Sequence, residues 1–441
     1  MDGIIYGIDV SKDELEFCSS SSQGSGSIKN SLGSIQKFIK RLQAEKVCVV
    51  VVEATGGYER LLVAELWAAG LPVAVVNPRQ TWAFGKSLGC EAKTDAIDAK
   101  TLPVPTDIAT VLKKLISCPD VASKRWIYEQ YDHMVMADTL QRPGGDAAVV
   151  RIHGSDRALA LVTDCTPRYC DADPRTGGAQ AVAETCRNIT AVGARPLAIT
   201  DCMNFGNPER PEIMGQFAGC IEGMAEACKA LDFPVVSGNV SLYNDTGTTG
   251  VQPTPSIGGV GILDNLRIMQ TTALKGPGHA LVQVGHTRGF LGASLYLREI
   301  AGREDGAPPP VDLAVERRNG DFVRRLIGER AVDACHDVSD GGLLVALAEM
   351  ALAGRLGFEI NAPSGVPLHA FLFGEDQGRY LVTCANPDSV VAAAAKAGVP
   401  TTVLGRTGPG DALTLNGRTL ISLASLRSLH EGWFPAYMSA S

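Results

Sequence analysis

The sequence lacks the residue pairs that disulfides and zinc sites need. It contains 12 cysteines, but they form no Cys-x-x-Cys pair and have no regular spacing. Its seven histidines also lie far apart along the chain. A disulfide framework and a Cys/His zinc site are therefore excluded as organising features. The cysteines are expected to be buried or free thiols in a reducing compartment.

Long apolar runs and positive charge are lacking as well. The longest apolar runs, such as Val47–Val52, have the length of a strand and fall far short of a membrane span. The N-terminus has Asp2 and Asp9 and no apolar core region, so no signal peptide is expected. The net charge of −8 argues against binding nucleic acid through bulk positive charge. A soluble, cytoplasmic protein without membrane contact is predicted.

The residues that are present predict a globular chain. Hydrophobic residues make up 45% and charged residues 20% of the 441 residues, which is enough material for real cores. The length suggests about three domains. The charge is uneven, because residues 1–102 carry a net charge of −1 and the rest carries −7. The first segment is thus less repelled by phosphate, though hardly basic.

The first 76 residues alternate between strand and helix patterns, which predicts a mixed α/β sheet. Val47–Val52 is a continuous β-branched run, typical of a strand buried on both faces. The other expected elements are strands at Ile4–Val10, Leu15–Cys18 (antiparallel to the first) and Pro72–Val76, and helices at Leu32–Gln43 and Tyr58–Ala69.

Four acids in this segment suit metal chemistry. Asp9 lies on the first strand and Glu53 closes the Val47–Val52 strand. Asp95 and Asp98 are three residues apart and would share one face of a helix. Carboxylates converging from two strands and a helix can hold two Mg²⁺ ions for phosphodiester cleavage. The alternative is that each acid is a solvated surface or capping group.

The motifs GIDVSK, EATGGYE, LPVAVVNPRQ and AKTDAIDA resemble the N-terminal domain of the IS110-family DNA transposases. The resemblance covers residues 1–102 and implies an RNase H-like (RuvC-like) mixed sheet. It places the family's metal-binding acids on Asp9, Glu53, Asp95 and Asp98. The family continues into a helical segment and a domain with a nucleophilic serine, and neither follows here. Recombination by this chain is therefore not expected.

A different pattern begins at Leu102–Pro103, because prolines 103 and 105 cannot continue a helix. Asp107 is expected to cap a helix through Ile116. Residues 103–130 are predicted to be a linker and helix, 131–275 one domain and 276–441 a second α/β domain. Further elements are expected at Ala147–Ile152, Ala158–Thr163, Ala179–Ile189, Pro196–Thr200, Ile213–Leu231, Ala280–Val284, Ser294–Ile300, Asp312–Ile327, Leu343–Met350 and Tyr380–Thr383, with a compact domain ending at Leu404-Gly405.

The stretch Pro234–Asn244 (PVVSGNVSLYN) is the most informative part of this region. Its apolar residues read as a buried strand with a short polar interruption. Gly238 would let backbone N–H groups approach a ligand closely. Asn239 offers an amide oxygen to a hard cation, and Ser241 a hydroxyl to an anion. The alternative is a β-bulge or a tight turn.

Of three further features, the last two have two readings each. Pro196–Thr200 is expected to deliver Asp201 at its carboxyl end, next to a ligand. The glycine-rich start after Asp173 is either an anion site with free N–H groups or a plain helix start. His336–Gly342 (HDVSDGG) is either an acid/base cluster or a capped glycine turn. We assign that motif no chemistry.

Seven motifs from Pro103 onward, among them GGDAAVVRI, DPRTGGAQAVAETCRN, ITDCMNFGNPE, SGNVSLYN and HDVSDGGL, resemble phosphoribosylformylglycinamidine synthase of purine biosynthesis. The resemblance implies one half of an aminoimidazole-ribonucleotide-synthase-like (PurM-like) two-domain unit. The family's reaction is the ATP-dependent amidination of formylglycinamide ribonucleotide, with Mg²⁺. By motif, Asp201 and Gly238 resemble ATP contacts, Asn239 a Mg²⁺ ligand and Ser241 a substrate contact.

Only the second half of that synthase is matched. The resemblance puts the catalytic histidine and most Mg²⁺ carboxylates in the absent first half, so the chain is expected to be inactive alone. Implied partners are a glutaminase subunit, a small bridging subunit, and either a separate first half or a second copy. The alternative function is a DNA-binding or nuclease remnant using the acids of residues 1–102. The join itself is interpreted as a gene fusion or an assembly error.

Overall fold

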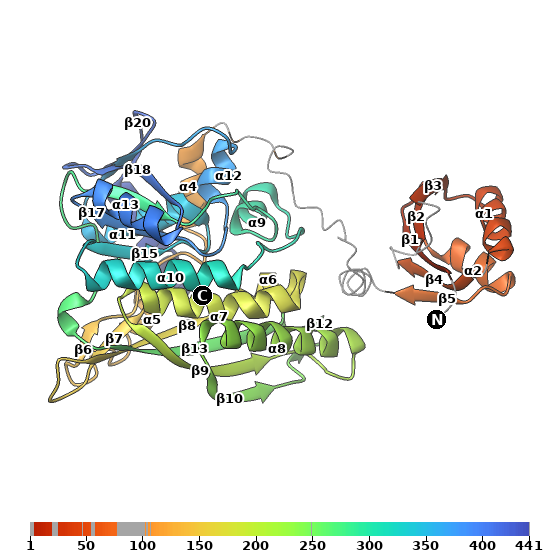
Figure 1. Ribbon diagram of the computed structural model, residues 1–441, viewed down its shortest axis with the longest axis horizontal. Helices are drawn as coiled ribbons and strands as arrows, with labels where there is room; N and C mark the ends of the chain where they lie inside the picture. The colour runs from red at the N-terminus through yellow and green to blue at the C-terminus, as the bar shows by residue number, and fades with distance from the viewer. Residues whose placement is uncertain are drawn as a thin grey trace. The chain divides into compact units, whose positions relative to one another are not determined.

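The computed structural model describes residues 4–19, 25–45, 47–53, 58–76, 102, 105, 107–247 and 249–440. The chain forms two compact units, Met1–Thr94 and Asp95–Ser441, drawn in Figure 1. The described strands of the first unit form one sheet, and those of the larger unit form three.

The first unit is a five-stranded mixed sheet with two helices. Its strands follow the order β3-β2-β1-β4-β5, with β1 parallel to β4, β4 parallel to β5, and β2 antiparallel to both β1 and β3. The predicted elements and the mixed α/β sheet are confirmed. Their bounds are β1 (Ile4–Val10), β2 (Glu14–Ser19), β3 (Ser25–Lys29), α1 (Leu32–Ala44), β4 (Val47–Glu53), α2 (Arg60–Ala68) and β5 (Val73–Val76).

Helical spacing predicts the buried face of α1 correctly. Its four apolar residues at that spacing are all buried and pack into one core with β1 and β4, and they are Ile35, Phe38, Ile39 and Leu42. The prediction that β4 is buried on both faces is wrong in part. Val50 and Val52 are fully buried, whereas Val49 and Val51 are half-buried. A period of two in burial marks a strand covered mainly on one face.

The larger unit begins with a six-stranded sheet of order β10-β9-β13-β8-β7-β6. Strand β10 is parallel to β9, and β13 is antiparallel to both β9 and β8. The bounds in this part are α4 (Ile108–Ile116), α5 (Arg125–Tyr128), β6 (Thr139–Gln141), β7 (Ala148–Arg151), β8 (Ala158–Asp164), α6 (Pro167–Ala172), α7 (Pro174–Ala191), β9 (Arg195–Asn204), α8 (Pro211–Leu231), β10 (Val235–Ser241), β11 (Asp245–Thr246), β12 (Thr249–Gly250) and β13 (Thr254–Leu263).

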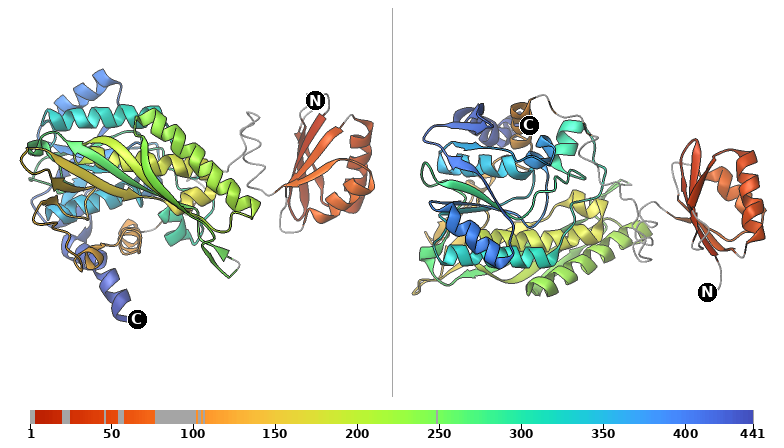
Figure 2. Two further views of the ribbon diagram at one scale, coloured as in Figure 1. Left: turned by 90° about the horizontal axis from the view of Figure 1, so that it is seen from below. Right: turned by 45° about the horizontal axis from the view of Figure 1, so that its top comes forward.

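Helices α7 and α8 cover one face of this sheet. Glycines on β13 permit the close approach, since a Cβ on Gly259 would lie 2.2 Å from the Thr185 side chain of α7. The opposite face of the sheet is open. Leu161 on β8 is 39% exposed there, and the small side chains of Thr163 and Thr200 line a hollow on the same face. The view from below in Figure 2 looks onto these strands.

The remainder of the larger unit contains a seven-stranded sheet of order β15-β17-β14-β18-β16-β19-β20. The predicted domain end at Leu404-Gly405 is wrong, because β18 runs through these residues and two more strands and a helix follow. The bounds are β14 (Ala280–Val284), α9 (Leu295–Ala301), α10 (Leu313–Gly328), β15 (Ala334–Asp337), α11 (Gly342–Gly354), β16 (Phe358–Ile360), α12 (Leu368–Phe373), β17 (Tyr380–Cys384), α13 (Pro387–Ala397), β18 (Thr401–Thr407), β19 (Ala412–Leu415), β20 (Arg418–Ser422) and α14 (Leu423–Ala440).

The described cysteines are free thiols, and several are buried, as predicted. No described helix combines the length and the apolar character that crossing a membrane requires. The three hydrophobic cores of the larger unit are built from residues between Leu102 and Leu426, and the core of the first unit lies between Tyr6 and Leu66. Each unit therefore has burial of its own to stabilise it.

Candidate functional site

The predicted ligand stretch is a continuous edge strand. Residues 235–241 form β10 without a turn, and the register shifts between Val235 and Ser237, just before Gly238. The reading as a bulge is thus correct in position, while the reading as a buried strand is wrong. Val236 is 71% exposed and Val240 is 53% exposed. An edge strand with exposed valines is expected to be covered by another surface.

Gly238 is required by its neighbour Asp201. The two residues are directly paired in the parallel register of β10 and β9. A Cβ at position 238 would lie 2.2 Å from Oδ1 of Asp201, so only glycine leaves room for that carboxylate. Asp201 lies inside β9 and not at its carboxyl end as predicted, because β9 continues to Asn204. Burial raises the pKa of Asp201.

Asn239 and Ser241 project from the face of the strand opposite to Gly238, since side chains alternate along a strand. Asn239 pairs with Cys202, and Ser237 pairs with Thr200, which lines the hollow on the open face of the sheet. The Ser241 hydroxyl donates to Oδ1 of Asn244 (3.2 Å). The structure therefore brings Gly238 and Asp201 into contact on one face and places Asn239 and Ser241 on the open face.

The glycine-rich start of α7 is capped from within the chain. The Asp173 carboxylate accepts hydrogen bonds from the backbone N–H groups of Arg175 (3.1 Å) and Thr176 (3.2 Å). A Cβ on Gly177 would lie 2.5 Å from the backbone of Cys170, and one on Gly178 would lie 2.4 Å from a carbonyl oxygen of α8. These glycines serve helix packing, and the plain helix start is the correct reading.

An acidic cavity of about 550 Å³ lies in the larger unit. His336 contacts two of the carboxylates that line it, Asp146 at Nδ1 (2.8 Å) and Glu349 at Nε2 (3.2 Å). Asp337, also in the wall, accepts from the fully buried Arg187 (3.4 Å). The remaining acids in its wall include Asp164, Glu184 and Asp340. Lys124 and Arg427 also line the cavity, but the carboxylates outnumber them, so further protons or cations are needed to balance the charge.

The pKa values in this cavity reflect that crowding. Burial raises the pKa of Asp164 to about 7 and that of Asp337 to about 6. Burial also raises the pKa of Glu184 well above its usual range. Burial alone lowers the pKa of His336, but the carboxylates of Asp146 and Glu349 outweigh it and raise the pKa well above its ordinary value. In the absence of a cation, protons supply the missing positive charge.

The same residues fit a divalent cation. One ligand atom from each of Asp146, His336 and Asp337 lies within 4.8 Å of the others. Asp146 is only 5% exposed, and its buried Oδ2 atom has no hydrogen-bond partner among the described residues. A buried carboxylate oxygen with no donor is suited to a hard cation such as Mg²⁺. The motif His336–Gly342 (HDVSDGG) thus belongs to a charged cluster, although no chemistry could be assigned to it from the sequence alone.

Sequence reasoning missed this cavity because its members are far apart in the chain. Asp146 and His336 are separated by 190 residues. GGDAAVVRI and HDVSDGGL both stand out as motifs. The one signal for Asp146 is that its carboxylate directly follows two glycines, Gly144 and Gly145. Nothing in the spacing shows that the two motifs meet.

The acids of the first unit are only partly described. Asp9 is exposed on β1, and Glu53 is the last residue of the neighbouring parallel strand β4. Ile8 pairs with Val52, so Asp9 and Glu53 each follow one residue later on adjacent strands. Asp95 and Asp98 lie outside the described residues.

Family models match both parts of the chain. Residues 144–263 match the N-terminal domain, and residues 276–417 the C-terminal domain, of the AIR synthase related proteins. Residues 6–104 match a transposase family of the IS110 type. The larger unit is therefore an AIR synthase related, PurM-like pair of domains with mixed sheets and helices, as predicted.

Sequence relatives narrow that class. Phosphoribosylformylglycinamidine synthase subunit PurL of Parvibaculum lavamentivorans is 58% identical over 352 residues, covering 79% of this chain and 48% of the relative. The Rhodospirillum rubrum subunit is 62% identical over 341 residues, covering 76% and 46%. The chain spans about half the length of these curated relatives. Over that span it is a polypeptide derived from phosphoribosylformylglycinamidine synthase.

Solved structures agree on the fold. T. maritima PurL complexed with FGAR has a TM-score of 0.59 at 18% identity, covering 79% of this chain and 55% of that one. T. maritima PurL complexed with ATP has a TM-score of 0.56 at 18% identity, covering 79% and 55%. PurLQS from T. maritima has a TM-score of 0.55 at 17% identity, covering 79% and 54%.

Proposed function

We propose that the larger unit is the nucleotide- and substrate-binding half of a phosphoribosylformylglycinamidine synthase. Its reaction would be the ATP-dependent amidination of formylglycinamide ribonucleotide, carried out only when a second polypeptide supplies the other half. The open face of the six-stranded sheet carries this proposal. That face bears Asn239 and Ser241, and a hollow lined by Leu161, Thr163 and Thr200 opens on it.

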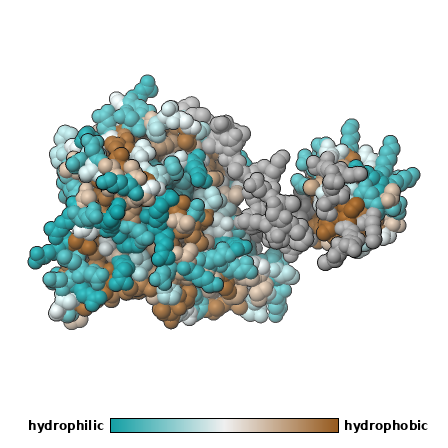
Figure 3. Space-filling model, in the orientation of Figure 1, coloured by the Kyte–Doolittle hydropathy of each residue, from teal (hydrophilic) through white to brown (hydrophobic). Residues whose placement is uncertain are grey.

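Exposed apolar side chains support a missing cover for this sheet. Leu161 of β8 is 39% exposed on this face. Figure 3 shows hydrophobic surface along the lower edge of the larger unit, where Figure 1 places β9 and β10. A second sheet packed here would bury that surface and close a site around Asn239 and Ser241. The occupant is a separate first half or, by analogy with single-half relatives, a second copy.

We assign roles by the motif resemblance, which names Asn239 and Ser241 on the open face and Asp201 and Gly238 on the other face of the sheet. Asp201 and Gly238 would contact ATP, Asn239 would bind Mg²⁺ through its amide oxygen, and Ser241 would contact the substrate. T. maritima PurL has been solved in complex with FGAR and in complex with ATP, which supports a substrate of this class and ATP as the two ligands. ATP phosphorylates the amide oxygen of the substrate and ammonia then displaces phosphate, so the chain's own contribution is to hold both ligands in position.

The acidic cavity is our proposed second cation site. Asp146 and Asp337 would hold Mg²⁺ through carboxylate oxygens, with His336 beside them. The cation would relieve the repulsion that otherwise protonates the cavity. The similarity to T. maritima PurLQS supports further subunits, and we propose that a glutaminase and a small bridging subunit are partners. The cytoplasm remains the proposed compartment, in keeping with the free thiols.

The test is an amidination assay with the purified full chain. Formylglycinamide ribonucleotide, ATP, Mg²⁺ and ammonium chloride are supplied with and without the N-terminal half of the R. rubrum subunit. We expect ATP binding by the chain alone and turnover only with the added half. Asn239→Ala and Ser241→Ala should abolish at least about nine-tenths of that turnover, because each removes a ligand contact.

Two results would contradict the proposal. Turnover by the isolated chain at the rate of the complemented pair would show that the first half is dispensable. Absence of both ATP binding and complementation, in a protein whose circular dichroism shows it folded, would remove the assignment altogether.

A second candidate function rests on the first unit. The parallel neighbours β1 and β4 bring Asp9 and Glu53 to the same level of the sheet, which supports an RNase H-like (RuvC-like) arrangement and a nuclease or DNA-binding remnant. Mg²⁺- or Mn²⁺-dependent cleavage of branched DNA, lost in Asp9→Ala, is the expected result. Neither cleavage nor binding of DNA at low salt would end this candidate.

The join near Leu102–Pro103 is proposed to be a gene fusion. A peptide that spans these two residues, identified by mass spectrometry of the source cells, would establish it. Detection only of peptides from intact synthase would show that the join is an assembly error.

A further inference from the structure

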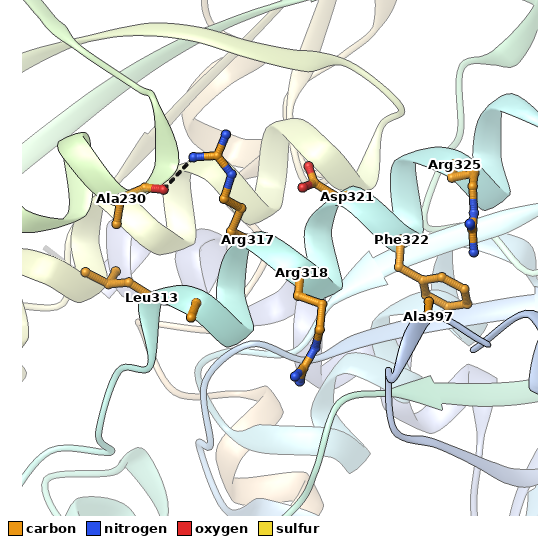
Figure 4. A pocket seen from close by; sticks show the side chains of 9 residues that line it. Ala230, Leu313, Arg317, Arg318, Asp321, Phe322, Arg325 and Ala397 are labelled. Atoms are coloured by element: carbon orange, nitrogen blue, oxygen red, sulfur yellow. Dashed lines mark hydrogen bonds between the residues drawn. The ribbon is translucent and has the colours of Figure 1, made fainter. Parts of the chain in front are cut away.

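A basic groove runs along α10, on the surface of the larger unit. We define the α10 groove by three arginines, Arg317, Arg318 and Arg325, and by the apolar residues Leu313, Phe322 and Ala397. It has a volume of about 660 Å³. Figure 4 shows the three guanidinium groups spread along the helix, with Phe322 and Ala397 beside Arg325.

None of the three arginines takes part in an ion pair among the described residues. Arg317 donates to the carbonyl oxygen of Ala230 (2.8 Å), and Arg318 donates to the side chain of Asn319 (3.4 Å). The Arg325 guanidinium lies over the ring of Phe322, 5.3 Å from its centroid. Each guanidinium has five N–H donors, so most of the donor capacity is unused. Their positive charges are available to a partner.

The acids near the groove are already engaged. Asp321 pairs with Arg324, on the same helix. Asp312 caps α10 by accepting from the backbone N–H groups of Ala314 and Val315, each at 3.0 Å. Glu316 is buried and pairs with Arg187 (2.8 Å). These carboxylates leave the groove with a net positive charge in a chain whose net charge is −8.

The charges are too far apart for one phosphate group. Arg317 and Arg325 are eight residues apart, which is about 12 Å along a helix axis. The cationic surface is therefore elongated along the helix. An extended or helical peptide with several carboxylates matches this length, whereas a single anion would leave at least one arginine unpaired.

The apolar residues decide between a peptide and a nucleic acid. Leu313 and Ala397 form part of the groove wall beside the aromatic ring of Phe322. Nucleic acid binding depends on a broad positive field, which a chain of net charge −8 does not provide. We propose that the α10 groove binds an acidic, amphipathic segment of a partner protein, its carboxylates on the arginines and its apolar side chains on Leu313 and Ala397. This inference is independent of the proposed catalytic role.

Fluorescence anisotropy of the full chain tests the proposal. The probe is a fluorescein-labelled peptide of about 12 residues, with glutamate and leucine at helical spacing. We expect saturable binding that weakens as salt is raised, because the contact is between exposed charges. The triple variant Arg317→Glu, Arg318→Glu, Arg325→Glu should bind at least about tenfold more weakly. A peptide with serine in place of leucine should also bind more weakly.

The matched control reverses three exposed arginines that do not line the groove, Arg267, Arg355 and Arg418, to glutamate. It makes the same change in net charge, so the control must retain binding. The single variants Arg317→Gln and Arg325→Gln, each expected to weaken binding about threefold, decide the matter if the triple variant does not fold. Equal affinity of parent and groove variants would overturn the proposal. So would displacement of the peptide by tripolyphosphate, or by a short oligonucleotide, at lower concentration than by unlabelled peptide.

Discussion

At the scale of single residues, Gly238 has a different role from the one its motif suggests. The motif predicts a glycine that lets a ligand approach the backbone. In the structure the space above Gly238 is filled by the Asp201 carboxylate of the neighbouring strand, 2.2 Å from where a Cβ would lie. Close approach of a ligand and room for the Asp201 carboxylate both require glycine. Only the room for the carboxylate explains how Asp201 keeps its position.

We predict that Gly238→Ala weakens ATP binding about tenfold and changes stability little. The new methyl group must displace the Asp201 carboxylate, which is the end of a side chain and can turn aside at low cost. Isothermal titration with ATP and thermal unfolding measure the two effects. Gly215→Ala is the control, because a Cβ there meets nothing within 4 Å and alanine stabilises a helix by about 0.5–1 kcal/mol over glycine. Equal loss of binding in both variants would contradict the Asp201 contact.

The cavity acids give a prediction about pH. The folded-state pKa values of Asp164 (about 7) and Asp337 (about 6) lie above the usual carboxyl value of about 4. The folded protein therefore holds protons that the unfolded chain has released. The resulting stability is complete below about pH 4 and is lost as the pH rises through about 6 to 7. The raised pKa of His336 acts in the same direction.

We predict that, with a chelator present, the melting temperature falls between about pH 5 and about pH 8. Asp164→Asn should reduce that fall, since an amide cannot lose the proton. Mg²⁺ should raise the melting temperature more at the higher pH, where it no longer competes with protons. Differential scanning calorimetry at several pH values checks both effects. An identical pH profile for parent and variant would show that Asp164 does not titrate in this range.

At the scale of elements, helix starts depend on acidic caps. Asp107, Asp173 and Asp312 each accept hydrogen bonds from the first N–H groups of the helix that follows. Asp173 is 2% exposed, so water cannot replace its carboxylate. The glycines behind it allow α7 to lie close to α6 and α8.

We predict that Asp173→Ala lowers the free energy of unfolding by about 1–2 kcal/mol. Asp107→Ala, at an exposed cap, should cost less because water can solvate the freed N–H groups. Urea denaturation measures both. A larger loss at Asp107 than at Asp173 would contradict the role of burial.

The open face of the six-stranded sheet yields a prediction about assembly. Leu161→Lys places a charge on that face without burying it in the larger unit. We expect an unchanged melting temperature and at least about a tenfold loss of complementation by the added first half, because a charge would be desolvated on assembly. Val391→Lys on α13 is the control, since Val391 is similarly exposed (38%, against 39% for Leu161). Complementation unaffected by Leu161→Lys would place the interface elsewhere.

At the scale of the whole molecule, the two units have separate hydrophobic cores. Among the described residues, each core is built within one unit. Units that each have a core of their own are expected to unfold in separate transitions.

We predict that Leu42→Asp removes the transition of the first unit and leaves that of the larger unit unchanged. Leu42 is fully buried, and an unpaired carboxylate there costs several kcal/mol. Calorimetry resolves the two transitions, and ATP should shift only the one that remains. A shift of both transitions in the variant would show that the units are coupled.

The sequence by itself determined the local structure. Strands such as β1 and β14, the buried face of α1 and the caps at Asp107 and Asp312 depend on residues within a few positions of one another. Propensity, periodicity and capping act over that range, so the pattern is legible in the chain. The synthase motifs likewise identified the larger part.

Only the tertiary structure decided which residues meet. Gly238 faces Asp201 because β9 and β10 are neighbours in one sheet, and Asp146 reaches His336 across 190 residues. The same holds for the exposure of β10 and for the open face beside it. Burial and charge pairing depend on distance in space, and no spacing in the sequence records that distance.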